Sequence, residues 1–290
     1  MMTHVIKKPD WIRIRPPSGK KFLGIKKIIE DLKLNTVCSD ARCPNMGECW
    51  SNGNATFMIL GSICTRNCGF CGVEKGTEGE SLSALEPGRI ARAVEKMGLK
   101  YVVLTSVDRD DLPDSGSEHF ANCINSIKSM DKEIIVEALI PDFRGDELCI
   151  RKIIAAHPDV VGHNIETVKE LQAHVRDERA GYDLSLEVLK KIRQMSSSIH
   201  AKSSLMLGFG ETEGMILKTM DDLRSAGVSI LTLGQYLRPS VIQLEVKEYI
   251  SPEKFEYYKR IACEKGFISV MSGPLVRSSY MAEKSLFSKD

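Results

Sequence analysis

Six of the nine cysteines lie between positions 38 and 71, and three of them form a compact motif directly after a strand-like run. This motif is Cys64-x3-Cys68-x2-Cys71. Three thiolates can hold three irons of one [4Fe–4S] cube, which leaves the fourth iron open for another ligand. Such an open iron suits chelation by the amino and carboxylate groups of S-adenosylmethionine. Zinc is the alternative, but zinc takes a fourth ligand and the loop contains no histidine, so we predict an iron–sulfur cluster.

A second triplet, Cys38-x4-Cys43-x5-Cys49, lies just upstream of the first. On its own, this spacing would equally fit a structural zinc site. Directly before the first motif, it predicts a second cluster. Three cysteines again leave one corner of the cube unfilled, so a residue from elsewhere in the chain must complete the site.

The composition excludes several classes of partner. The chain of 290 residues carries 40 basic and 39 acidic residues, and this balance gives no electrostatic reason to expect nucleic acid or a membrane surface. No apolar run approaches the ~20 residues of a bilayer span, and no signal peptide is recognisable, so we expect a cytoplasmic protein. In a reducing compartment, clustered thiols indicate metal chemistry. The isolated cysteines Cys123, Cys149 and Cys263 are expected to be buried packing residues.

The rest of the chain alternates between strand-like and helix-like segments. Near-continuous apolar runs predict buried strands at 56–60, 101–107, 134–140, 159–165, 200–207 and 228–236. Amphipathic periodicity predicts helices at 88–97, 118–130, 146–156, 185–195, 213–226 and 252–265. Six βα units indicate a parallel sheet but are too few for a closed eight-stranded barrel. We expect an α/β fold with an open (β/α)6 partial TIM barrel, and a doubly wound sheet is the alternative.

Three regions are expected along the chain. Residues 1–55 read as an irregular arm with one short helix near 25–32, and this arm carries the second triplet. Residues 56–245 form the barrel, and residues 246–290 form a C-terminal helix and tail. We expect the two extensions to cap the mouth of the barrel, where the C-terminal ends of the strands place functional groups.

Several blocks of sequence resemble the lipoyl synthase family of radical S-adenosylmethionine enzymes. The two cysteine triplets carry the resemblance together with Arg277-Ser-Ser-Tyr280, and further similar blocks extend it over residues 11–282. The other blocks are Thr105-Ser-Val-Asp-Arg-Asp-Asp-Leu-Pro113, His163-Asn-Ile-Glu-Thr167 and Gly234-Gln-Tyr-Leu-Arg-Pro-Ser240. The chain departs from the family pattern at Ser62 and at Val161-Gly162, beside the expected site.

The resemblance implies an activity and a role for each cysteine triplet. Enzymes of the family insert two sulfur atoms at C6 and C8 of an octanoyl chain attached to a lysine of a carrier domain. Cys64, Cys68 and Cys71 would hold the cluster that cleaves S-adenosylmethionine. The upstream triplet, Cys38, Cys43 and Cys49, would hold an auxiliary cluster that is consumed as the sulfur donor.

A serine of the Arg277-Ser-Ser-Tyr280 block would complete the auxiliary cluster. Of its two serines we favour Ser279, with Ser278 as the alternative. An alkoxide is a poorer match for iron than a thiolate, so it should leave more easily when the cube is dismantled.

Polar residues at or beyond strand ends are candidates for binding S-adenosylmethionine. Within a glycine-containing turn, Gly208 would let backbone amides approach the ligand closely. The other candidates are Thr105, Ser106, Glu137, Asn164 and Arg176. Each of these could instead satisfy polar groups of the barrel rim, and we expect His163 to be structural.

The resemblance also implies partners, and it leaves rivals. The expected partners are octanoylated lipoyl-carrier domains (the glycine cleavage H protein or a 2-oxoacid dehydrogenase E2), a reducing electron donor and an iron–sulfur carrier that rebuilds the auxiliary cluster. The rivals are a sulfur-inserting enzyme of the biotin synthase or methylthiotransferase type, a two-cluster electron carrier and a zinc-stabilised binding module. The upstream triplet and the Arg-Ser-Ser-Tyr block argue against the first rival.

Overall fold

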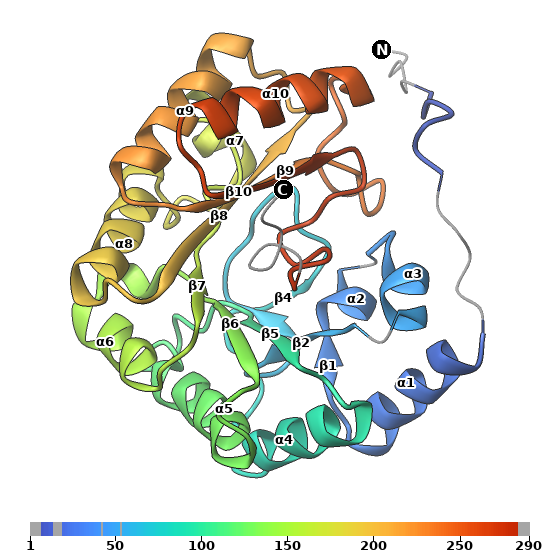
Figure 1. Cartoon of the computed structure of the whole chain (residues 1–290), viewed down its shortest axis with the longest axis vertical. Helices are drawn as coiled ribbons and strands as arrows, with labels where there is room; N and C mark the ends of the chain where they lie inside the picture. The colour runs from blue at the N-terminus through green and yellow to red at the C-terminus, as the bar shows by residue number, and fades with distance from the viewer. Residues whose placement is uncertain (1–6, 14–18, 42, 53, 284–290) are drawn as a thin grey trace.

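The computed structural model describes residues 7–13, 19–41, 43–52 and 54–283. Its centre is an eight-stranded sheet with helices packed around the outside (Figure 1). The sheet order is β1-β2-β5-β6-β7-β8-β9-β10. All pairs are parallel except β1 with β2. The strands are β1 (Asn35–Thr36), β2 (Thr56–Ile59), β5 (Tyr101–Ser106), β6 (Ile135–Leu139), β7 (Val160–Gly162), β8 (His200–Leu207), β9 (Ile230–Gln235) and β10 (Ser269–Gly273).

The strand order confirms the open partial barrel. From β2 to β10 the parallel strands follow one another in chain order, whereas a doubly wound sheet reverses its order at a switch point. The two edge strands, β1 and β10, do not pair with each other among the described residues, so the sheet stays open. The sixth predicted strand is followed by an unpredicted seventh parallel strand, β10, which pairs with β9 over 269–273.

The outer layer consists of amphipathic helices whose apolar faces pack on the sheet (Figure 1). All six helices predicted after the arm are present, five in the barrel and one following it, with small shifts at their ends. They are α4 (Glu86–Met97), α5 (Ser117–Met130), α6 (Glu147–Ala155), α8 (Tyr182–Met195), α9 (Glu213–Ser225) and α10 (Pro252–Glu264). Shorter turns lie between them: η1 (Phe143–Gly145), η2 (Lys169–Leu171) and α7 (Gln172–Val175). No helix among the described residues is long and apolar enough to cross a membrane.

The N-terminal arm is more ordered than the sequence predicted. It contains α1 (Lys20–Asp31), α2 (Val37–Asp40) and α3 (Met46–Ser51) instead of one short helix. The ring of Phe22 packs on Trp50 with 5.2 Å between centroids, which anchors α1 on α3. The expectation of an irregular arm was wrong because α2 and α3 are too short to show a periodic pattern; tertiary packing holds them in place.

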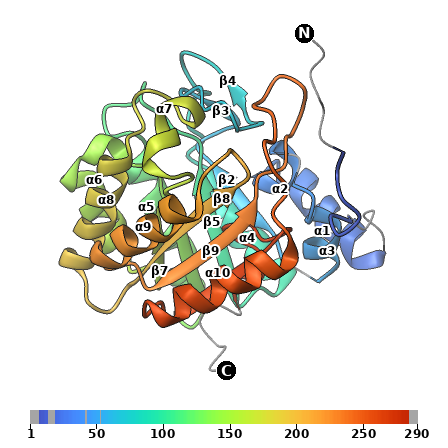
Figure 2. The same cartoon turned by 90° about the horizontal axis from the view of Figure 1, so that it is seen from above.

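A small two-stranded sheet, β3 (Ile63–Cys64) with β4 (Glu74–Lys75), stands apart from the main sheet. It lies at one end of the barrel together with α7, and α2 lies close to it (Figure 2). The backbone N–H of Gly69 donates to the carbonyl of Val175 at 2.9 Å, which ties this unit to α7. The first cysteine motif therefore sits at the end of the barrel that the fold predicts for function.

Candidate functional site

The loop that carries the first cysteine motif leaves β2 through a sharp turn. Leu60 has φ of 70° and Gly61 has φ of 93°, so two successive residues are left-handed. Leu60 is unusual there because its side chain makes this conformation costly. The carboxylate of Glu86 accepts the Leu60 N–H at 3.1 Å, and Arg109 donates to the Leu60 carbonyl at 2.9 Å. The partly buried Glu86 and the buried Arg109 hold the turn that directs the chain toward Cys64.

Arg66 fixes the loop against neighbouring strand ends. Its buried guanidinium donates to Asp110 at 2.9 Å and to Asp142 at 2.7 Å, residues that follow β5 and β6. Thr65 adds a backbone bond of 3.0 Å to the carbonyl of Asp108. Charge-assisted bonds of this kind are stronger than neutral ones, so the loop is anchored to the barrel before any ligand binds.

The three thiols of this loop share one desolvated environment. Burial raises the pKa of Cys68 to about 11 and that of Cys71 to about 12, and Cys64 and Cys68 raise the latter further. Burial also raises the pKa of Cys64. Three partly buried thiolates so close together repel one another unless a cation compensates them. This donor set fits the iron–sulfur cluster expected here, because iron supplies that charge.

A cavity of about 290 Å³ opens above the three cysteines. Four of the predicted S-adenosylmethionine contacts line it: Thr105, Ser106, Asn164 and Arg176. The hydroxyl of Ser106 and the Nε of Arg176 are buried and have no hydrogen-bond partner in the described part of the chain. Buried polar atoms are normally satisfied, so these two fit a polar ligand in the cavity.

Two predicted contacts lie elsewhere. Glu137 occupies the middle of β6, and its buried carboxylate is bound by Lys202 at 2.8 Å and by Tyr101 at 2.6 Å inside the barrel. At Gly208, an added Cβ would come within 2.2 Å of the Gln235 side chain, so the missing side chain serves close packing. Neither residue is among those that line the cavity.

Sequence reasoning missed several residues of the cavity wall. Glu166 is the most distinctive: its φ is 65°, its carboxylate accepts from Asn164 at 3.1 Å, and burial raises its pKa. Asp108 also lines the cavity, and burial raises its pKa to about 6. Glu166 lies within the His163–Thr167 block, and Asp108 opens the acidic run after β5. Both residues directly follow a predicted or observed strand, and that position was the sequence signal that could have identified them as part of the site.

His163 behaves as the structural residue that we expected. Its Nε2 lies 2.9 Å from the Ser185 hydroxyl and its Nδ1 lies 3.0 Å from the Ile140 carbonyl, so both ring nitrogens are paired. Burial lowers the pKa of His163 to about 4, and the positive charge of Arg176 lowers it further. The ring is therefore neutral at physiological pH.

The second cysteine triplet lines a smaller cavity of about 30 Å³, which shares Thr56 of β2 with the larger one. Cys38, Cys43 and Cys49 face it, and Ser279 reaches it from the C-terminal tail. The Ser279 oxygen accepts a hydrogen bond from the Thr56 hydroxyl at 2.8 Å. Ser278 lines only the larger of these two cavities. Of the two candidate serines, Ser279 is the one that the structure brings to the cysteines.

Contacts between arm and tail build this second site. Asn45 donates to the Leu275 carbonyl at 2.6 Å, and the Tyr280 hydroxyl donates to Glu48 at 3.2 Å. Gly234 at the end of β9 permits the tail to pass, because a Cβ there would lie 2.1 Å from the Val276 carbonyl. Burial raises the pKa of Cys38 to about 11. These thiols, too, need a cation before they can act together as thiolates.

Arg277 connects the two cavities. Its side chain lines both of them, and its positive charge acts on Cys43. Its guanidinium donates a hydrogen bond to the adjacent Val276 carbonyl at 2.6 Å. The guanidinium is thus positioned to balance negative charge between the two sites.

The three isolated cysteines, Cys123, Cys149 and Cys263, differ in their exposure to solvent. Cys123 and Cys149 are buried, as expected. Cys263 is exposed, so the expectation for that residue was wrong. It lies on α10 next to Ala262, whose side chain takes the buried face of the helix.

Comparison with known proteins agrees with this geometry. Residues 58–223 match the model of the radical SAM superfamily, and residues 2–43 match the N-terminal domain of lipoyl synthase of the radical SAM family. Lipoyl synthase of Marinobacter nauticus is 50% identical over 278 residues, which cover 96% of this chain and 80% of the relative. Lipoyl synthase of Halobacterium salinarum is 52% identical over 281 residues, which cover 95% and 90%.

Solved structures share the fold at low sequence identity. Methylornithine synthase aligns with a TM-score of 0.56 and 13% identity over 73% of this chain and 63% of its own. The FeFe-hydrogenase maturase HydG from Carboxydothermus hydrogenoformans gives 0.58 and 15% over 73% and 52%. The barrel, the two cysteine sites and the extent of the sequence match lead to one assignment. The chain belongs to the lipoyl synthase family of the radical S-adenosylmethionine superfamily, whose members use S-adenosylmethionine and [4Fe–4S] clusters.

Proposed function

We propose that this protein inserts two sulfur atoms at C6 and C8 of an octanoyl chain carried on a protein lysine. The observation that supports this most is the arrangement of the two cavities. The larger one has Cys64, Cys68 and Cys71 in its wall, and the smaller one is lined by the upstream triplet. Thr56, Arg277 and Ser279 border both cavities, so a substrate in the larger cavity lies next to the second cysteine site.

The first triplet and the strand-end residues would hold the cofactor pair. Cys64, Cys68 and Cys71 would bind three irons, and the unpaired polar atoms of Ser106 and Arg176 would bind polar groups of S-adenosylmethionine. When bound, S-adenosylmethionine with its cluster supplies the radical that removes hydrogen, and the auxiliary cluster supplies sulfur. Arg66 keeps the loop fixed meanwhile, so the cysteines hold their geometry relative to the barrel.

The walls of the larger cavity suit an acyl chain. Apolar side chains from four strands or their ends face it: Met58, Val107, Leu139, Ile140 and Met206. Such walls contact methylene groups and exclude water. Exclusion of water matters because a primary carbon radical attacks any group that it meets.

Ser279 would complete the auxiliary cluster as its fourth protein ligand. Its side chain lines the same small cavity as Cys38, Cys43 and Cys49, and the Thr56 hydroxyl donates a hydrogen bond to its oxygen. An oxygen ligand binds iron less firmly than a thiolate, which suits a cluster that is dismantled in each reaction. Arg277 would balance the negative charge of the thiolate-bound cube.

The proposed activity also implies the partners of the protein. They are octanoylated lipoyl-carrier domains (the glycine cleavage H protein or a 2-oxoacid dehydrogenase E2), a reducing electron donor and an iron–sulfur carrier that restores the auxiliary cluster, in the cytoplasm. A two-cluster electron carrier is disfavoured, because it needs no cavity of about 290 Å³ between its metal sites.

The direct test is anaerobic turnover of an octanoyl-lysine peptide with S-adenosylmethionine and a reductant, followed by mass spectrometry. We expect the peptide to gain two sulfur atoms, with 5′-deoxyadenosine as the by-product. A reaction without S-adenosylmethionine is the control and should leave the peptide unchanged. Cleavage of S-adenosylmethionine with no sulfur in the peptide would contradict the proposal and favour a different substrate.

A further inference from the structure

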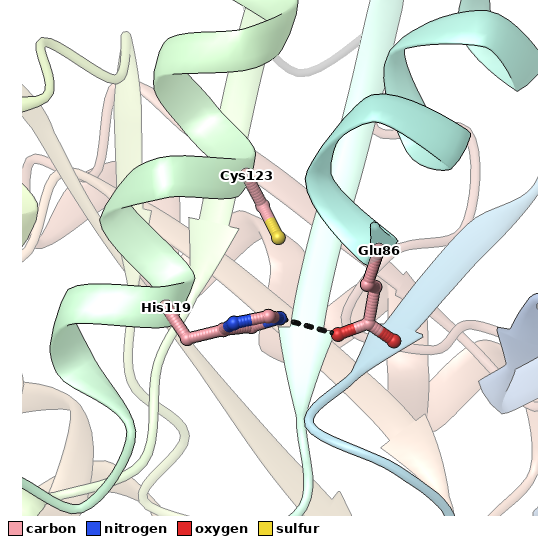
Figure 3. Close-up of side chains that lie close together, drawn as sticks. All are labelled: Glu86, His119 and Cys123. Carbon is pink, nitrogen blue, oxygen red and sulfur yellow. Dashed lines mark hydrogen bonds and ion pairs between the residues drawn. The ribbon is translucent and has the colours of Figure 1, made fainter. Parts of the chain in front are cut away.

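A third group of residues that could bind a metal lies in the helical layer, outside both cysteine sites. Glu86 on α4 and His119 and Cys123 on α5 point toward one another (Figure 3). The His119 Nε2 lies 2.7 Å from a Glu86 carboxylate oxygen. One ligand atom from each of the three residues lies within 4.8 Å of those of the other two. An oxygen, a nitrogen and a sulfur donor thus converge from two helices.

The two helices place these residues by simple geometry. His119 and Cys123 are four positions apart, so they occupy the same face of α5. Glu86 is the first residue of α4, the helix that packs against α5. The side chains of His119 and Glu86 are 11% and 13% exposed, and Cys123 is fully buried. The group is therefore shielded but open enough for an ion to enter.

The hydrogen bond between Glu86 and His119 accounts for the closeness of these two side chains. It does not account for the thiol of Cys123 beside them. The thiol lies beside a carboxylate, and burial together with the Glu86 charge raises its pKa. We propose that Glu86, His119 and Cys123 bind one zinc ion. Carboxylate oxygen, imidazole nitrogen and thiolate sulfur are all zinc ligands, and three protein ligands leave a fourth position for water.

Binding at this site balances charge and protons. The ion takes the position between His119 and Glu86, His119 binds through a deprotonated Nε2, and the Cys123 thiol loses its proton. One thiolate and one carboxylate then neutralise the two positive charges of zinc. This neutral set avoids the cost of an uncompensated charge in the helical layer.

The site would also stabilise the turn before the first cysteine motif. Glu86 accepts the N–H of Leu60, whose left-handed conformation starts the loop. Zinc would join α4 to α5 and fix the Glu86 carboxylate, whose Oε2 contacts both the Leu60 N–H and the His119 Nε2. It is a structural site, and the inference does not depend on the sulfur-insertion proposal.

The test is metal analysis of the iron-loaded full-length protein after incubation with zinc and desalting. We expect about one zinc per chain in addition to the iron of the two clusters, with Zn-edge X-ray absorption showing one sulfur at about 2.3 Å and the remaining neighbours as nitrogen or oxygen. Cys123→Ser and His119→Gln should each lose the retained zinc without loss of iron.

Cys149→Ser is the matched control, because Cys149 is also a buried helix cysteine but belongs to no group of three ligand residues in the described part of the chain. This variant should retain zinc like the parent. Three sulfur neighbours in the absorption spectrum would place zinc at the cluster cysteines and overturn the proposal. Absence of retained zinc in the parent, or its retention in Cys123→Ser, would leave only the ion pair and a packing thiol.

Discussion

The two cysteine sites use the same number of thiols but are built in different ways. In the first, Cys64, Cys68 and Cys71 lie within eight consecutive residues, and the barrel anchors them through Arg66. In the second, the cysteines span 38–49 on and around two short helices, and the wall includes Ser279 from the opposite end of the chain. The first site is local, whereas the second depends on long-range contacts.

Different sets of contacts hold the two sites in place. The hydrogen bonds that hold the second site join residues more than 220 positions apart in sequence, as in Thr56 with Ser279 and Asn45 with Leu275. None of these residues supports the Arg66 network of the first loop. Damage to the junction of arm and tail should therefore leave the radical site intact, and this expectation can be tested step by step.

The largest effect should follow from removal of the first triplet. Substituting Cys64, Cys68 and Cys71 together by Ala should halve the iron from about eight to about four per chain, because one cube is lost. Cleavage of S-adenosylmethionine should stop. Iron analysis and chromatographic measurement of 5′-deoxyadenosine check both points, and retained cleavage would refute the cofactor assignment.

Removal of the second triplet should separate the two functions. In the Ala variant of Cys38, Cys43 and Cys49, S-adenosylmethionine cleavage should continue, since the first loop is anchored to the barrel independently. Sulfur insertion into the octanoyl peptide should end. Mass spectrometry of the peptide alongside the 5′-deoxyadenosine assay provides the comparison. Lipoyl product from this variant would mean that sulfur comes from another source.

Ser279 tests the long-range part of the second site. Replacing an outer-shell partner of a metal site costs about 10- to 100-fold, so loss of a ligand in Ser279→Ala should reduce sulfur insertion at least that much. Cleavage of S-adenosylmethionine should persist. In Ser279→Cys the cube should stay bound but release sulfur more slowly, because thiolate holds iron more firmly.

Ser278→Ala is the matched control for this experiment, since Ser278 lines only the larger of the two cavities. It should affect sulfur insertion much less than Ser279→Ala. The reverse order would assign the ligand to Ser278 instead.

Much of the scaffold was predictable because its signals are local. The six buried strands and the helices between them follow from apolar runs and 3.6-residue periodicity. β10 was missed because Ser269–Gly273 contains two serines and a glycine, so it lacks the apolar run of a central strand. Its pairing with β9 over five residues comes from tertiary context, which overrides a weak local preference.

In the candidate site, too, the sequence shows local signals but not contacts between distant residues. Spacing in the sequence predicts the cysteine triplets as ligand sets. The structure puts Thr105, near the end of β5, and Arg176, directly after α7, in the wall of the larger cavity. Glu137 was misplaced because a strand has two ends and an interior, and sequence does not show which residues reach the rim. Its partner Lys202 lies 65 positions away, so no local pattern reports the buried pair.

The smallest expected effect concerns Asn45, whose side-chain amide joins the arm to the Leu275 carbonyl at 2.6 Å. Because Asn45 is buried, Asn45→Ala leaves that carbonyl without its donor and should cost about 1 kcal/mol of stability at the junction of arm and tail. The auxiliary cluster should then be released at lower temperature than in the parent, while the first cluster is unaffected. Anaerobic heating monitored by iron release and by residual S-adenosylmethionine cleavage separates the two. Asn125→Ala, an exposed position on α5, is the control, and equal loss of both clusters in Asn45→Ala would show that the two sites are coupled.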